Sequence, residues 1–163
     1  MAQAGSIVTK KARAILALNA PAALSVIADL EGVQLPQLSA QQVIAQNVAP
    51  EIIEHSKVTR YPALHLYCAK VTNLLREKFR TFSGEAQMVV EVRMSQDRLD
   101  DLDRQTQWHA DAVTRVLDEN RGDWGDGVFY GGGYEISYGP VKHGGRNFLQ
   151  IAKIVFTVDI SLN

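Results

Sequence analysis

The sequence predicts an α+β fold: a mainly antiparallel, four-stranded sheet with one long helix packed on it and a helical segment before it. Three observations lead to this prediction. Helical spacing of apolar residues dominates the first third, strand-like alternation begins near Tyr61, and an Asp-rich start opens a long amphipathic stripe between two β regions. The 163 residues, 46% of them hydrophobic, suffice for one compact unit. We divide it into a helical N-terminal arm, residues 1–58, and an α+β core domain, residues 59–163.

The N-terminal arm is expected to hold several short helices. Apolar and basic residues between Ile7 and Leu18 follow helical spacing, and Pro21 suits the first turn of a second helix that ends before Gly32. This pattern predicts two short helices or one kinked helix. Ser39 and Gln42 then stand at capping-box spacing, which favours one more short helix.

The rest of the arm has modest apolar content. Pro50 interrupts the chain, and residues 51–55 have room for one more helical turn. Because Ala and Gln are frequent here, we expect an arm that packs fully only against another subunit.

Two strands are predicted after the arm. Leu64, Leu66 and Cys68 alternate with their neighbours, and a clearer alternation runs from Ala86 to Met94. These runs are expected to pair as an antiparallel hairpin with a long, basic connection.

The most secure helix follows the hairpin. Its start is crowded with carboxylates, which favour a helix N-terminus. Its apolar stripe consists of Leu99, Leu102, Thr106, Ala110, Val113, Val116 and Leu117. Three glycines, Gly122, Gly125 and Gly127, are expected to end it.

Two strands are expected in the last third: a glycine-interrupted strand from Val128 to Tyr138 and a terminal strand from about Asn147 to Leu162. The terminal strand would be more than twice the usual length of about five or six residues. One of its faces consists of Phe148, Ala152, Ile154, Phe156, Val158, Ile160 and Leu162. On the other face we predict that Leu149, Ile151 and Val155 contact another subunit.

No metal or cofactor is expected. The four histidines, His55, His65, His109 and His143, form no pair at metal-ligand spacing. His65 is expected on a strand face and His109 on the flank of the long helix. Oxygen ligands for a divalent cation are present at Asp97, Asp100, Asp101 and Asp103, but a charged first helical turn explains this cluster without a ligand.

No catalytic motif is recognised either. Gly131, Gly132 and Gly133 lack the frames of phosphate-binding loops and precede strand-like alternation rather than a helix. Cys68 lies within a predicted strand, and no nucleophile elbow is present. The prediction is therefore a protein that is not an enzyme.

The charge balance and the distribution of apolar residues limit the classes of partner that the chain is expected to bind. Lys and Arg total 17 against 18 for Asp and Glu, which argues against general nucleic-acid binding. The hairpin connection is locally basic, so Arg76, Lys78 and Arg80 are candidates to line a channel and meet DNA transiently in a ring. The apolar stretches are interrupted by charge, so we expect no membrane-embedded segment and no secretory leader.

The order of elements resembles the tail-terminator and head-tail joining proteins of long-tailed bacteriophages. The resemblance rests on four stretches: Tyr61–Val71, Gly84–Ser95, Leu99–Asn120 and Arg146–Leu162. It implies a structural virion protein of the phage neck that forms a homo-oligomeric ring, commonly a hexamer, on the tail tube. Such a ring caps the tube and forms the interface for head attachment.

The partners that the resemblance implies are the tail tube protein, head-tail connector or adaptor proteins and the tail sheath. Its location would be the virion, after assembly in the host cytoplasm. Two alternatives stay open: a head-completion adaptor that joins portal to tail, and, from another class, a small ligand-binding regulatory α+β domain.

Overall fold

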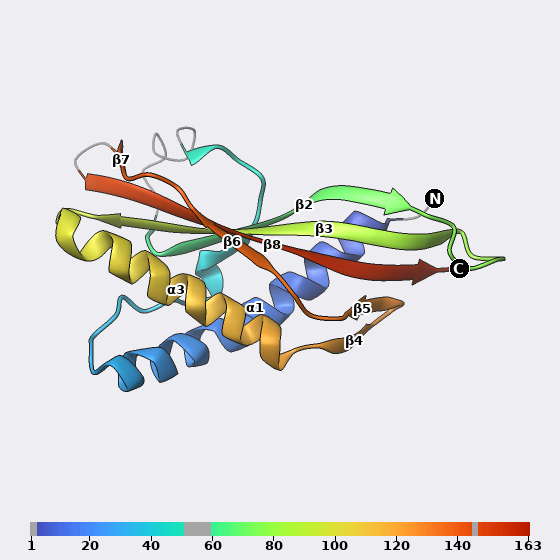
Figure 1. Cartoon of the computed structure of the whole chain (residues 1–163), viewed down its shortest axis with the longest axis horizontal. Coiled ribbons are helices and arrows are strands. Elements are labelled where there is room, and N and C mark those ends of the chain that lie inside the picture. The colour runs from blue at the N-terminus through green and yellow to red at the C-terminus, as the bar shows by residue number, and fades with distance from the viewer. Residues whose placement is uncertain (1–2, 51–59, 145–146) are drawn as a thin grey trace.

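The computed structural model describes residues 3–50, 60–144 and 147–163. Within these ranges the chain forms two layers, a long twisted sheet and two α-helices that lie on the same face of it (Figure 1). The boundary at residue 58 between arm and core, and the predicted helical turn at residues 51–55, lie outside the described ranges.

Two long strands form the centre of the sheet. β3 (Phe82–Gln96) and β8 (Asn147–Leu162) pair antiparallel without a break, from Phe82 opposite Leu162 to Gln96 opposite Phe148. On the other side of β3 lies β2 (Ala63–Asn73), which joins it in the predicted hairpin. The expected bounds of the terminal strand are confirmed.

The four-stranded, mainly antiparallel sheet predicted from the sequence is wrong. The described residues form an eight-stranded mixed sheet of order β1-β2-β3-β8-β5-β4, with β6 and β7 also paired to β8. β1 (Val43–Ala45) is parallel to β2, and β4 (Gly122–Gly125) pairs with β5 (Val128–Tyr130). Gly131–Gly133 separate β5 from β6 (Glu135–Tyr138), so the predicted glycine-interrupted strand is two strands.

Other strands of the same chain pair with β8 along both of its edges. β3 lies along one edge, while β7 (Lys142–Gly144), β6 and β5 follow one another along the other. Its edges are therefore not the surface that another subunit would extend, and any contact beyond the core must use its faces.

The N-terminal helix is single. α1 runs from Ala4 to Glu31 through Pro21, where two short helices or a kinked one were expected. Proline removes one backbone donor and disfavours a helix interior. Here burial of Leu16, Leu24 and Ile27 on both sides of Pro21 holds the helix together. Gly32 ends it in the left-handed conformation, as predicted.

α1 is apolar on its outer face as well. Exposed apolar residues recur every four positions, at Leu18, Ala22, Val26 and Leu30. α1 has 28 residues and contains an 18-residue stretch with a mean hydropathy of 1.5, so by length and composition it is long and apolar enough to cross a membrane. The sequence prediction did not foresee such a segment, and a core helix or an N-terminal signal sequence would meet the same criterion.

The segment after α1 is extended rather than helical. Gln42 closes a capping turn by accepting a hydrogen bond from the Ser39 amide at 2.8 Å, but the turn is a 3-10 helix, Ala40–Gln42. Val43 then enters β1, and Arg13 of α1 donates to the Val43 carbonyl at 3.1 Å. The predicted capping box is therefore confirmed, and the predicted short helix is a single 3-10 turn that ends before Val43.

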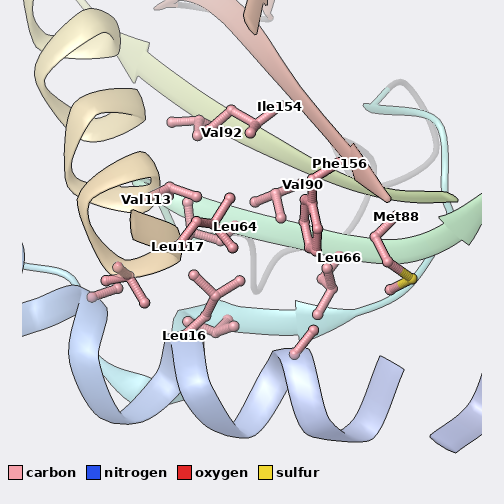
Figure 2. Packing of buried hydrophobic residues seen from close by; sticks show 14 of the residues in the cluster. Leu16, Leu64, Leu66, Met88, Val90, Val92, Val113, Leu117, Ile154 and Phe156 are labelled. Carbon is pink, nitrogen blue, oxygen red and sulfur yellow. The ribbon is translucent and has the colours of Figure 1, made fainter. Parts of the chain in front are cut away.

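The core lies between the helices and the inner face of the sheet. α3 (Leu99–Glu119) begins two residues after the predicted start at Asp97 and ends one residue before the predicted end at Asn120, and its stripe is buried apart from exposed Leu99. Val113 and Leu117 of α3 and Leu16 of α1 point toward the inner face of the strands (Figure 2). That face consists of Leu64, Leu66, Met88, Val90, Val92, Ala152, Ile154, Phe156, Val158 and Ile160.

A close backbone approach at the hairpin gives a test of this packing. A Cβ on Gly84 would overlap the Thr72 carbonyl oxygen of β2. We expect Gly84→Ala to destabilise the protein by about 1–3 kcal/mol in urea unfolding, because backbone must move. Gly131→Ala is the matched control: its φ is not positive, the nearest atom is 3.9 Å away, and stability should hardly change. Equal stabilities would contradict the hairpin register.

Candidate functional site

Neither α1 nor α3, the two α-helices within the described ranges, lies on the outer face of the sheet. This face includes the predicted interface residues of β8: Leu149 is buried, whereas Ile151 and Val155 are half-buried. Strand alternation places all three opposite the core-facing Ile154 and Phe156. The structure thus brings the three residues together on one surface, and their contact with another subunit stays a prediction.

A buried charged cluster lies in the middle of this face. Glu91 Oε2 and Arg93 Nη2 are 2.8 Å apart, and both side chains are almost fully buried. The Lys153 ammonium lies 3.8 Å from Glu91 Oε1, and Arg93 also donates to the Val48 carbonyl. His65 stands opposite Glu91 on β2 and is buried too. The cluster therefore spans three neighbouring strands.

The cluster is not fully satisfied. Arg93 Nε and Nη1 and His65 Nδ1 are buried without a hydrogen-bond partner in the part of the chain that the structure describes. Burial lowers the pKa of His65, and the neighbouring Arg93 guanidinium lowers it further. Unpaired buried donors are costly, and buried ion pairs contribute little net stability. The cluster is thus a weak source of stability.

A cavity of ≈ 300 Å³ opens beside the cluster. Its lining includes Glu91, Lys142 and Lys153, with Leu149 and Ile151 supplying apolar wall. Ser137 also lines the cavity and stands opposite Lys153 in the β6–β8 register, and Lys153 is paired with Glu91. The arrangement can hold a small charged group.

Sequence reasoning placed Glu91 and Arg93 among the alternating polar positions of a strand and did not foresee their burial. The available signal was the presence of opposite charges two residues apart within an apolar run, since same-face neighbours can pair. His109 was expected on the flank of α3; it is instead buried, and its Nδ1 lies 2.7 Å from the Gln105 carbonyl oxygen.

The other candidate site residues do not lie together in the structure. Among residues 3–50, 60–144 and 147–163, no group of three potential metal ligands converges. Asp100 and Asp101 lie exposed in the first turn of α3, while Asp103 accepts a hydrogen bond from Gln150 at 3.0 Å. Cys68 is half-buried beside a bulge of β2, and burial raises its thiol pKa.

The basic hairpin loop is largely neutralised by its own chain. Arg76 bridges Asp159 at 2.9 Å and Glu85 at 3.2 Å, two carboxylates that face each other across β3 and β8. Arg80 pairs with Glu77 at 3.2 Å. Lys78 is the one basic side chain of this loop without an ion pair to a described residue. Channel lining by the three residues stays a prediction, with less free positive charge than the sequence alone indicated.

Comparison with protein-family models, with curated proteins and with solved structures finds no match for the chain.

Burial of the Glu91–Arg93 pair predicts that a single conservative substitution will strongly lower the stability of the fold. Glu91→Gln removes the counter-charge of Arg93 and leaves a buried guanidinium uncompensated, so we expect a loss of about 3–5 kcal/mol in urea unfolding. Glu85→Gln on the same strand is the control, because this exposed carboxylate should contribute about 1 kcal/mol or less. Similar losses in both variants would contradict burial of the Glu91–Arg93 pair.

The pKa of His65 predicts the direction of a pH effect. Its folded pKa lies below the unfolded value of 6.5, so the unfolded state takes up a proton first. Stability should therefore be full above pH 6.5 and fall as the pH drops below it. His65→Gln should make the fall in urea midpoint between pH 7.5 and 5.5 shallower. An unchanged profile would show that His65 is not held neutral by burial.

Proposed function

We propose that this protein is a non-enzymatic structural subunit of a phage neck, a tail terminator that caps the tail tube as a homo-oligomeric ring. The setting comes from the resemblance in element order. The structure contributes a separate argument, which concerns how much apolar surface one copy leaves uncovered.

The observation that carries the proposal is exposed apolar surface at several places. Phe79 is fully exposed, and Leu18, Leu30 and Leu75 are 80%, 74% and 66% exposed. Single exposed apolar residues are ordinary, whereas groups of them mark interaction sites. The groups here lie on the hairpin loop and along α1, so one copy offers at least two separate surfaces to partners.

The outer sheet face supplies a third surface. Ile151 and Val155 are half-buried and flank the exposed Lys153 on β8, which gives an apolar patch with a positive charge at its centre, while the Glu91–Arg93 pair beside it is buried. Such a surface suits a partner that needs both shape and charge match. We assign it to the stacking contacts of the ring, with the tail tube on one side and the head-tail connector on the other. The tail sheath is a further candidate neighbour.

Two alternatives stay distinct. A head-completion adaptor joining portal to tail would use the same surfaces in another order. A small ligand-binding regulatory domain is favoured by one observation, the ≈ 300 Å³ cavity with Glu91, Lys142 and Lys153. A monomer that binds a small charged metabolite there would support that class instead.

Capping of a tail tube tests the proposal directly. Tail-tube subunits from the same phage should stop elongating when the purified protein is added, and the capped ends should carry a ring in negative-stain micrographs. Tubes of unchanged length with bare ends would contradict the terminator role. Binding to portal complexes alone would transfer the protein to the adaptor class.

Charge on the outer face should weaken the stacking contact. Ile151→Lys with Val155→Lys places two ammonium groups on the proposed contact, so we expect binding to tail tubes to fall about tenfold or more. Gln107→Lys is the control, since Gln107 is exposed on α3 and therefore lies on the helical side of the sheet, away from the outer face. Circular dichroism should show all three chains folded. Undiminished tube binding by the double variant would remove this face from the interface.

A further inference from the structure

The tip of the β2–β3 hairpin carries three exposed apolar side chains. We call Leu74, Leu75 and Phe79 together the knob. Phe79 is fully exposed, and the neighbouring Leu74 and Leu75 are exposed as well. Phe79 and Leu75 have φ values of +67° and +49°, a region that L residues with bulky side chains avoid. Glycine or asparagine would be easier to place there. Retaining a large apolar side chain at a strained, solvated position indicates a role in contact.

A groove of mixed character lies toward the opposite end of the molecule. It runs between the second half of α1 and the extended segment after it and has a volume of ≈ 560 Å³. Its apolar lining consists of Pro21, Leu24, Ala28, Val33, Leu35 and Leu38, and its polar lining of Ser25, Asp29, Gln34 and Gln37. Leu18, one helical turn before the groove, extends the apolar surface.

The charges of the two surfaces are complementary. Lys78 on the knob forms no ion pair with a described residue. Asp29 lies at the groove, and Glu31 ends the same helix; neither has a cation within ion-pair distance among the described residues. Glu31 also lies near Asp111 of α3, where burial and the charge of Glu31 raise the carboxyl pKa. The groove side therefore holds unbalanced negative charge, and the knob side holds an unpaired cation.

The two surfaces cannot meet within one chain. The hairpin tip lies at one end of the long axis, beside the C-terminus, and the second half of α1 lies toward the other end (Figure 1). Different surfaces at opposite ends of identical subunits make a head-to-tail contact, which closes into a ring when the rotation between neighbours allows it.

We propose that the hairpin tip of one copy inserts into the α1 groove of the next copy. Phe79 and Leu75 contact the apolar residues of the groove, and Lys78 faces Asp29 and Glu31. This assignment rests on the proposed ring assembly and names the contact that closes it. It also places Lys78 against the neighbouring subunit rather than against DNA.

Two variants each disable one half of the contact. Phe79→Gly removes the knob and relieves the strained backbone, so the monomer should keep its thermal stability. Ser25→Arg puts a long cation into the groove at an exposed helical position that tolerates it. Each variant alone should sediment as a monomer where the wild type forms a ring. Leu99→Ala, an exposed leucine outside both surfaces, is the control and should still form rings.

Mixing the two variants gives the decisive readout. An equimolar mixture retains one intact knob and one intact groove, so it should form a heterodimer and nothing larger. A charge exchange adds a second readout. Lys78→Glu and Asp29→Lys should each raise the dissociation constant about tenfold, and combining them in one chain should restore assembly.

The outcomes separate this inference from the proposed function. Rings that persist in Phe79→Gly and Ser25→Arg, or monomeric variants that fail to form a heterodimer when mixed, overturn the knob-and-groove contact and leave the terminator role standing. A wild-type protein that is monomeric and does not cap tail tubes overturns both.

Discussion

The unbroken antiparallel pairing of β3 with β8 is the constraint on which the rest of the structure depends. Four of the other described strands pair directly with one of these two: β2 lies along β3, and β5, β6 and β7 follow one another along β8. The remaining two, β1 and β4, pair with β2 and β5. Because side chains alternate along a strand, a shift of one residue would exchange the inner face with the outer face. The register therefore decides at once which residues meet the helices and which remain for partners.

Both described helices cover the inner face of the sheet. The outer face therefore differs from the inner face in the chemistry of its side chains. On the inner face, apolar side chains of α1, α3 and the strands form one core. On the outer face, the same ladder brings His65, Glu91 and Lys153 into one row, with Arg93 beside them. Those charges are partly buried by their neighbours and incompletely paired. A fold that used this face only for its own stability would be better served by apolar residues.

The sequence predicted the elements with strong, uninterrupted periods and missed those set by tertiary contacts. The stripe from Leu102 to Leu117 and the alternation from Ala86 to Met94 predicted α3 and β3, although β3 begins four residues before Ala86 and ends two residues after Met94. β1 and β7 have three residues each, too few for a period, and they exist only because β2 and β8 offer free edges. α1 continues through Pro21 because packing outweighs propensity there.

The candidate surfaces were predictable in part. Alternation along β8 placed Leu149, Ile151 and Val155 on the outer face, which the structure bears out as a matter of position. The burial of Glu91 and Arg93 could not be predicted, because it depends on neighbouring strands and on the backbone at Val48. Arg76 had looked like free positive charge; only the register of β3 with β8 reveals the two carboxylates that occupy it.

The central claim is that one copy of this chain leaves surfaces that only further copies complete. Native mass spectrometry tests it most directly, since one chain has a mass of 18.0 kDa and each assembly is a multiple of it. The account predicts one discrete oligomer of ring size that gains population with concentration. A spectrum containing the single chain alone at every concentration would contradict it.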